Sequence, residues 1–316
     1  GWGSVFSSSS WVDEDSKFVR DISAFFAPSY FPWSQPLDYS AKLFSEEIRL
    51  VSEFDGPLQF LLGLYYEDKE INFENFGLFG GADPALNIFA PGAVLLIHST
   101  TDRTLTQKAL FGELYYNVTE QVKLTFGGRA FKYDRETTDQ NFASAFSGDN
   151  LSTVEGDESD ISLKAGIEYT PSDSTLLYAT WSEGFRLGYP VSAEALPVCD
   201  QDNDGVYDGS NGISTGQRLI DSDFVENYEL GGKFSLLNNQ LKINAAMYQI
   251  NWEGIPIAQV FDFCSATTNA GEARSRGAEL EVSYSLSENL FVNFSSSYVD
   301  AELTEDAVAL GAQAGD

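Results

Sequence analysis

The chain has 316 residues, with 48 acidic and 18 basic side chains, a formal net charge of -30 and 14% aromatic residues. So large an acidic excess excludes a nucleic-acid binder, which needs a basic surface, and the aromatic content excludes an acidic disordered chain. No apolar run approaches the ~18 residues of a membrane helix, and the longest candidate, 93–97, is far too short.

Alternation of apolar and polar residues recurs along the chain, over 122–129, 161–170, 224–252 and 279–284. A β-strand has a side-chain period of two, so each parity forms one face of a sheet. The clearest strand places Tyr228, Leu230, Phe234 and Leu236 on one parity and Asn227, Glu229, Lys233 and Ser235 on the other. One face is therefore apolar and the other charged, and an alternation of about ten residues matches a tilted span of the hydrocarbon layer.

The predicted connections are of two kinds. Tight turns are expected at 54–57, 117–120, 171–173, 238–239 and 287–288, whereas long loops are expected at 72–102, 134–157, 187–223 and 256–270. In a soluble sandwich the apolar face is the core and the connections at both ends are usually short. Short turns at one end and long loops at the other are typical of outer-membrane barrels.

Aromatic pairs at 65–66 and 115–116 lie toward strand ends, where they fit either an interfacial girdle or ordinary strand positions. The sequence predicts an all-β fold: part of an antiparallel transmembrane β-barrel of about 11 strands, with long extracellular loops and short periplasmic turns.

Several segments resemble successive blocks of one known barrel family. The segments are 45–50, 63–66, 111–115, 127–129, 178–188, 226–233 and 277–281, in matching order and spacing. Together they resemble the TonB-dependent outer-membrane receptors over about residues 40–302. The resemblance implies a non-enzymatic importer in the outer membrane of a Gram-negative bacterium, in contact with outer-membrane lipid and powered by the TonB complex through a plug domain. The commonest ligand of such receptors is a ferric siderophore, with cobalamin, heme or oligosaccharide as competitors.

The chain also departs from that family. Such receptors have about 22 strands and a plugged lumen, and no signal peptide, TonB box or plug domain is recognised ahead of Trp2. We therefore expect residues 1–316 to be an internal part of a single barrel domain. The alternative is a complete small barrel, but an odd strand count would be unusual for a bacterial outer-membrane protein.

One loop contains a candidate calcium site. Counted from its first aspartate, carboxylates stand at positions one, three, five and nine with Gly205 at six, a spacing that lets oxygen ligands converge on a hard cation. Position twelve is Asn211 rather than glutamate, so the last ligand would be Asp221, Asp223 or water. A solvated acidic turn is the alternative. The predicted Ca²⁺ ligands are the carboxylates of Asp200, Asp202, Asp204 and Asp208 and the backbone oxygen of Val206.

The two cysteines lie in consecutive long loops, Cys199 in one and Cys264 in the next. A chain exported to the periplasm passes through an oxidising compartment, so we predict a disulfide between them, with two buried free thiols as the alternative.

Other candidates favour ordinary structural roles. His98 is the only histidine and lies on an apolar segment of a predicted loop without a motif around it. The charges expected to face the lumen mix both signs, and we expect them to pair with one another or with the plug; they are Arg129, Lys164, Glu168, Glu229, Lys233, Glu279 and Glu281.

Three functions are consistent with the sequence. An active importer is favoured by the resemblance. A passive porin would have an open lumen and no plug, and a calcium-dependent surface-interaction protein would use the barrel as an anchor for the acidic loop.

Overall fold

The computed structural model describes residues 1–21, 33–79, 95–142, 149–190, 206, 208, 219–261, 264–269, 271–306 and 314–315. Eleven strands form one antiparallel sheet in the order β1-β2-β3-β4-β5-β6-β7-β10-β11-β14-β15. Their bounds are β1 Gly3–Asp21, β2 Trp33–Ser52, β3 Leu58–Phe79, β4 Leu95–Asn117, β5 Val122–Asn141, β6 Asn150–Ser172, β7 Thr175–Arg186, β10 Asp223–Leu236, β11 Leu241–Glu253, β14 Glu272–Ser287 and β15 Leu290–Leu303.

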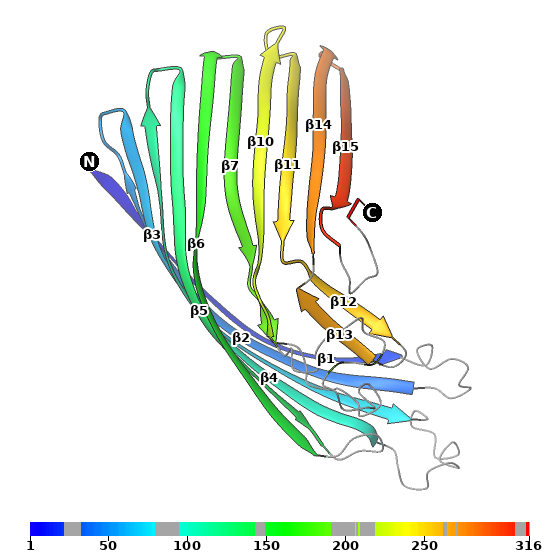
Figure 1. Cartoon of the computed structure of the whole chain (residues 1–316). Coiled ribbons are helices and arrows are strands. Elements are labelled where there is room, and N and C mark those ends of the chain that lie inside the picture. Colours follow the sequence, from blue (N-terminus) through cyan, green and yellow to red (C-terminus); the bar gives the residue numbers. More distant parts are fainter. Residues whose placement is uncertain are drawn as a thin grey trace.

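Two small hairpins accompany the sheet: β8 (Tyr189–Pro190) pairs with β9 (Leu219–Ile220), and β12 (Pro256–Phe261) pairs with β13 (Cys264–Asn269). The sheet is a curved open wall (Figure 1). This arrangement confirms the prediction of an antiparallel all-β fold with about 11 strands. Among the described residues there is no helix long and apolar enough to cross a membrane.

The five predicted short turns are all present, and all lie at the upper end of the sheet in Figure 1. The strand ends that flank the predicted 187–223 connection, Arg186 and Asp223, lie at the opposite end. The predicted separation of short turns from long connections is therefore confirmed for the described strand ends. Asp202, in the long connection, lies outside the described residues.

The predicted loops at 72–102 and 134–157 are largely strand, so those bounds were wrong. Strand β3 continues to Phe79 and β4 begins at Leu95, while β5 continues to Asn141 and β6 begins at Asn150. The backbone ladder extends beyond the point where the apolar alternation ends, because strand pairing depends on main-chain hydrogen bonds, which polar side chains also permit. The other two predicted loops also contain strand, in β8–β9 and β12–β13.

The sheet has two chemically different faces. Large apolar side chains of one parity are exposed along the turn-proximal half of the strands, among them Leu64 (56%), Leu110 (57%), Phe126 (52%), Leu230 (54%) and Met247 (59%). Cross-strand pairs such as Leu64↔Leu110 and Leu230↔Met247 hold them in continuous rows. We call this the outer face and the opposite parity the inner face. An apolar face this extensive matches the lipid-facing band of a barrel.

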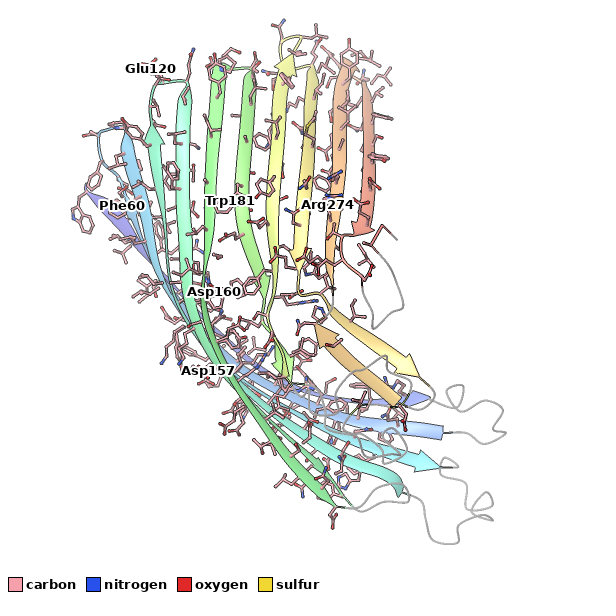
Figure 2. The ribbon with its side chains drawn as sticks, viewed as in Figure 1. Phe60, Glu120, Asp157, Asp160, Trp181 and Arg274 are labelled. Carbon is pink, nitrogen blue, oxygen red and sulfur yellow. The ribbon has the colours of Figure 1, made fainter. Side chains whose placement is uncertain are left out.

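The apolar band has a sharp boundary on its far side. Moving away from the short turns, the outward positions become charged at Asp68, Lys108, Lys132, Glu183, Glu226, Arg276 and Asp300. Strands β1–β6 have 19 to 23 residues, about twice the 9–11 that a membrane crossing needs. They continue past the band as a tall extension, on which Asp157 lies, whereas Glu120 marks the short-turn end (Figure 2).

The sheet forks between β6 and β7. Their pairing runs only from Lys164↔Ser182 to Ser172↔Thr175, whereas β6 stays paired with β5 as far as Asn150. Beyond the fork, the outer side of β7 packs on the inner side of β5, where the rings of Phe185 and Phe131 stack with centroids 3.8 Å apart. The end of the wall opposite the short turns is therefore two layers thick.

Candidate functional site

The inner wall at the level of the apolar band is lined by charges that pair across strands. Lys164 contacts Glu113 at 2.5 Å, and Lys123 contacts Glu168 at 2.7 Å. The Arg129 guanidinium lies 5.1 Å from the centroid of the Tyr65 ring. We expect the lumen-facing charges to pair with one another or with the plug. Lys164 and Glu168 do form ion pairs across strands, but their partners, Glu113 and Lys123, are not among the charges that the sequence analysis names.

Glycines let these long side chains lie flat against the wall. A Cβ at Gly127 would stand 2.8 Å from the Lys164 side chain, which crosses this position to reach Glu113. A Cβ at Gly63 would lie 2.1 Å from the Phe111 ring, and Gly231 and Gly277 make the same room for tyrosine rings. Bare backbone at these positions keeps the bulky groups out of the lumen.

The inner face of the extension beyond the apolar band carries a small buried core. Ala109, Phe131 and Tyr133 are at most 7% exposed, and Phe185 and Leu187 pack against them from the second layer. Since these side chains come from β4, β5 and the end of β7, the core joins the two layers made by the fork.

A short segment, residues 219–223, crosses this core, and we call it the strap. The Ser222 hydroxyl donates to Glu158 at 2.6 Å and accepts from the backbone N–H of Gly188 at 3.0 Å. The Tyr133 hydroxyl also donates to Glu158 and lies 3.1 Å from Ser222 Oγ. Burial and the Glu158 carboxylate raise the pKa of Tyr133 to about 12, so its hydroxyl keeps its proton at neutral pH.

The end of the strap is fixed by Asp223, which is 3% exposed. Its carboxylate accepts two hydrogen bonds from Arg186, at 3.0 and 2.7 Å, and one from the Trp252 indole N–H at 2.7 Å. Asp221 is held through its backbone, because the Asn269 amide bonds its N–H at 2.8 Å and its carbonyl at 3.0 Å. Both flanks of the long 187–223 connection are thereby anchored to the wall.

Arg135 lies beneath the strap and contacts it through a single weak hydrogen bond within the described ranges. Among the described residues its buried Nε and Nη1 atoms have no hydrogen-bond partner, and Nη2 makes a 3.4 Å contact to the carbonyl of Ile220. Burial lowers the pKa of Arg135. A buried guanidinium with free donors suits a carboxylate or another oxygen-rich anion.

His98 lies in β4 and not in a loop, which corrects the prediction for this residue. Its ring stacks between Phe76 and Phe142, with centroids 4.6 and 4.1 Å away, and its Nε2 lies 2.8 Å from Glu74. This packing at the tip of the strand extension is a structural role.

The predicted calcium and disulfide sites mostly lie outside the described residues. Cys199, Asp200, Asp202 and Asp204 are not described, nor is the side chain of Cys264. Val206 and Asp208 are described, and each makes an interaction. Within the ranges that the structure describes, no group of three or more His, Cys, Asp or Glu side chains could hold a metal ion. Both sites stay predictions.

Comparison with known proteins decides the family. The sequence model of the "TonB dependent receptor-like, beta-barrel" family matches residues 2–315. The chain belongs to the TonB-dependent receptor family. Its members are non-enzymatic transporters of the Gram-negative outer membrane, so this TonB-dependent receptor barrel is an outer-membrane structure whose apolar band faces lipid.

Two curated relatives and one solved structure are similar to this receptor barrel. A probable TonB-dependent siderophore receptor, PiuA of Acinetobacter baumannii, is 25% identical over 175 residues, 55% of this chain and 21% of that protein. The ferric-pyoverdine BN7/BN8 receptor of Pseudomonas putida is 25% identical over 193 residues, 61% and 20% of the two chains. The ferric yersiniabactin uptake receptor FyuA of Yersinia pestis has the same fold, with a TM-score of 0.67 and 14% identity over 96% of this chain and 40% of that one. The chain spans about a fifth of the length of these curated relatives.

Sequence reasoning did not find the strap network. Ser222 lies 64 residues from Glu158 and 89 from Tyr133, so no local motif links them. From the sequence alone, Asp223 is only one candidate for the last ligand of the predicted calcium site. One feature of the sequence does point toward the network: Tyr133 and Arg135 stand two positions apart on one strand, so both side chains lie on the same face, which is the inner one.

Proposed function

We propose that this chain is the barrel portion of an active outer-membrane importer, which takes up a ferric siderophore with energy from the TonB complex. The observation that carries the proposal is the family match along residues 2–315, together with curated relatives that are named as siderophore receptors. The plug through which the TonB complex would act is expected elsewhere in the full-length protein.

The chemistry of the extracellular end supports an oxygen-rich ligand. Arg135 has two buried nitrogens without a partner in the part of the chain that the structure describes. Arg186 is 57% exposed beside the Trp252 ring, whose centroid lies 5.6 Å from the guanidinium. Guanidinium groups bind carboxylate and related oxygen pairs through two parallel hydrogen bonds. A bound ferric chelate would supply such oxygens where the strap leaves donors unused.

Uptake of radioactive iron by a strain that depends on the full-length receptor tests this function. Cells fed a panel of ferric siderophores should accumulate iron from at least one of them, and a protonophore or deletion of TonB should abolish the uptake. Arg135→Ala should weaken uptake of that chelate, whereas Lys132→Ala, a neighbouring charge on the outer face, should leave it unchanged.

The passive porin makes the opposite prediction. Small solutes would then enter without energy, and neither the protonophore nor loss of TonB would change the rate. That result would refute active import.

A further inference from the structure

The fork leaves one edge of β6 without a neighbouring strand. β7 stays paired with β6 only as far as Lys164↔Ser182, whereas β5 stays paired with β6 as far as Asn141↔Asn150. Beyond the fork, β6 therefore has a strand on one side only. We call residues 151–159 the free edge, and Asp157 marks its position in Figure 2.

The backbone groups of the free edge point away from β5. In an antiparallel pair, alternate residues bond to the partner strand, and the residues between them direct their N–H and C=O groups to the other side. The N–H of Thr170 donates to the carbonyl of Gln121 at 2.8 Å, so the even-numbered residues of β6 bond to β5. The odd-numbered residues therefore face the side that β7 has left.

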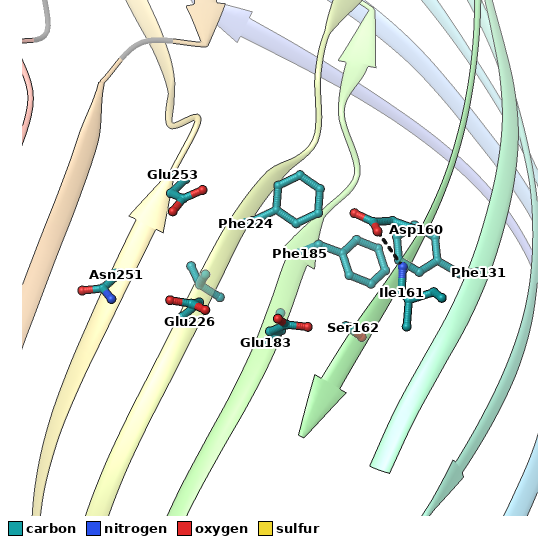
Figure 3. Close-up of a pocket in the computed structure, with 12 residues that line it drawn as sticks. Phe131, Asp160, Ile161, Ser162, Glu183, Phe185, Phe224, Glu226, Asn251 and Glu253 are labelled. Atoms are coloured by element: carbon teal, nitrogen blue, oxygen red, sulfur yellow. Dashed lines mark hydrogen bonds between the residues drawn. The ribbon is translucent and has the colours of Figure 1, made fainter. Parts of the chain in front are cut away.

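The two donors nearest the fork are capped by carboxylates of the chain itself. Glu183 accepts from the backbone N–H of Leu163 at 2.8 Å. Asp160 accepts from the backbone N–H of Ile161 at 2.7 Å, as Figure 3 shows. Within the described ranges no hydrogen bond reaches the next four N–H groups along the edge, those of Ser159, Asp157, Glu155 and Thr153. Such a row of unpaired groups is a template for another strand.

The free edge is regular and accessible. The β5–β6 ladder runs from Val122↔Tyr169 to Asn141↔Asn150 without a bulge, and the odd-numbered residues from 151 to 163 are all exposed. Natural proteins commonly interrupt an edge with proline, a bulge or a very short strand. Residues 151–159 contain no proline. The backbone here can therefore accept an extended segment along its whole length.

The charge of the edge restricts which segment can pair with it. Residues 149–163 contain no lysine, arginine or histidine, and their carboxylates belong to Asp149, Glu155, Asp157, Glu158 and Asp160. A second copy of this chain would place the same carboxylates against the edge, and like charges directly opposite each other destabilise a sheet. The edge therefore disfavours self-pairing and favours a basic segment.

The neighbouring strand does not neutralise these charges. Glu155 lies opposite Glu136, and Asp157 lies opposite Asp134. Lys132 is shared between Asp134 and Asp157, at 3.5 and 3.7 Å, and no ion pair involves Glu155 in the part of the chain that the structure describes. Lysine or arginine side chains on an added strand would compensate the two edge carboxylates.

We propose that the free edge of β6 binds an extended segment of a partner protein by β-strand addition, and that this segment carries lysine or arginine at two alternate positions. In this mode, main-chain hydrogen bonds supply affinity and alternate side chains supply specificity. The outward side chains of the edge are, in order, Leu151, Thr153, Glu155, Asp157, Ser159 and Ile161. This order is apolar, hydroxyl, acidic, acidic, hydroxyl and apolar in both directions, so a matching segment has two basic residues flanked by hydroxyl and then apolar residues.

Binding of a labelled synthetic peptide to the full-length receptor in non-ionic detergent tests the proposal. The probe has valine, threonine, lysine, lysine, threonine and valine at alternate positions, with serine between them. Wild-type receptor should bind it, and hydrogen–deuterium exchange of receptor peptides covering 151–160 should slow. The same probe methylated on its backbone nitrogens keeps both lysines but loses its donors, and should not bind.

Two receptor variants separate charge from backbone pairing. Glu155→Gln with Asp157→Asn should weaken binding by about twofold to thirtyfold, as expected for the loss of two opposite-charge cross-strand pairs. Asp157→Pro should weaken binding more than Asp157→Asn, because both remove the same charge but proline also removes a donor of the free edge. Proline is tolerated there, since the N–H of an odd-numbered residue does not bond to β5.

The matched control is Asp68→Asn with Glu70→Gln. It makes the same charge change on the outer face of β3, which is paired on both sides, and should bind the probe like wild type. Equal binding of the methylated probe, or unchanged exchange at 151–160, would overturn the proposal. Cross-linking of two receptors through residues 151–159 would identify a second copy as the occupant and would also overturn it. Absence of probe binding would mean that the carboxylates only protect the edge. None of these measurements depends on iron uptake.

Discussion

Replacing Asp223 with alanine should release the strap from the wall. The carboxylate is 3% exposed and accepts three hydrogen bonds, two from Arg186 and one from Trp252. Alanine leaves all three donors without their acceptor. The strap would then be held mainly by Ser222 and by the amide of Asn269.

The size of the effect follows from the exposure of each partner. A hydrogen bond to a charged group contributes about 1.5–3 kcal/mol. The Arg186 side chain is 57% exposed, so water can replace most of the hydrogen bonding that it loses with Asp223. The indole N–H and the buried end of the strap are less easily rehydrated. We expect the free energy of local opening of the strap to fall by about 2–4 kcal/mol, which raises the equilibrium constant for opening by about 30-fold to several hundredfold.

Hydrogen–deuterium exchange of the full-length receptor measures this opening. Peptides covering 219–223 should exchange faster by that factor in Asp223→Ala, while peptides covering 161–169 in the apolar band stay unchanged. Asp221→Ala removes an equal charge from an exposed position whose strap contacts are made by the backbone, and should change exchange by no more than about twofold. Wild-type exchange rates in Asp223→Ala would refute the anchoring role.

Three further predictions concern other parts of the wall. Gly63→Val should lower the yield of folded barrel on heat-modifiability gels, because its side chain would meet a phenylalanine ring, whereas Gly56→Ala, with open space around its Cβ position, should fold normally. The pKa of Tyr133 is raised to about 12, so the stabilisation that its neutral hydroxyl gives the strap should be complete below about pH 10 and lost between about pH 10 and 12. In Tyr133→Phe, hydrogen–deuterium exchange of the strap should lack this pH-dependent rise. Calcium should protect the 199–223 loop from proteolysis, and Asp202→Ala with Asp204→Ala should abolish that protection; equal cleavage with calcium and with chelator would leave an acidic turn.

The predicted cysteine bridge has its own measurement. Mass spectrometry of the unreduced full-length receptor should find the peptides of Cys199 and Cys264 joined, and reduction should separate them. Alkylation of both thiols without prior reduction would contradict the bridge.

The sequence by itself determined the fold class, the two faces and the positions of the short turns. Period-two alternation at positions such as Leu230 and Lys233 is local information, because neighbouring side chains of a strand necessarily point to opposite faces. The turn at 237–239 is equally local: Leu237, Asn238 and Asn239 all have positive φ, and asparagine tolerates that conformation better than most residues. These features need no knowledge of the rest of the chain.

Only the tertiary structure decided how far the strands extend, where the sheet forks and what holds the strap. Beyond the apolar band the outer face is charged and the inner face is apolar only at its small core, so the alternation that reveals a strand fades while the backbone pairing of β5 with β6 continues to Asn150. The fork depends on Phe185 meeting Phe131, and the strap depends on Ser222 meeting Glu158, contacts between residues 54 and 64 positions apart. Such contacts depend on which strands become neighbours when the wall curves, and short-range sequence patterns do not contain that information.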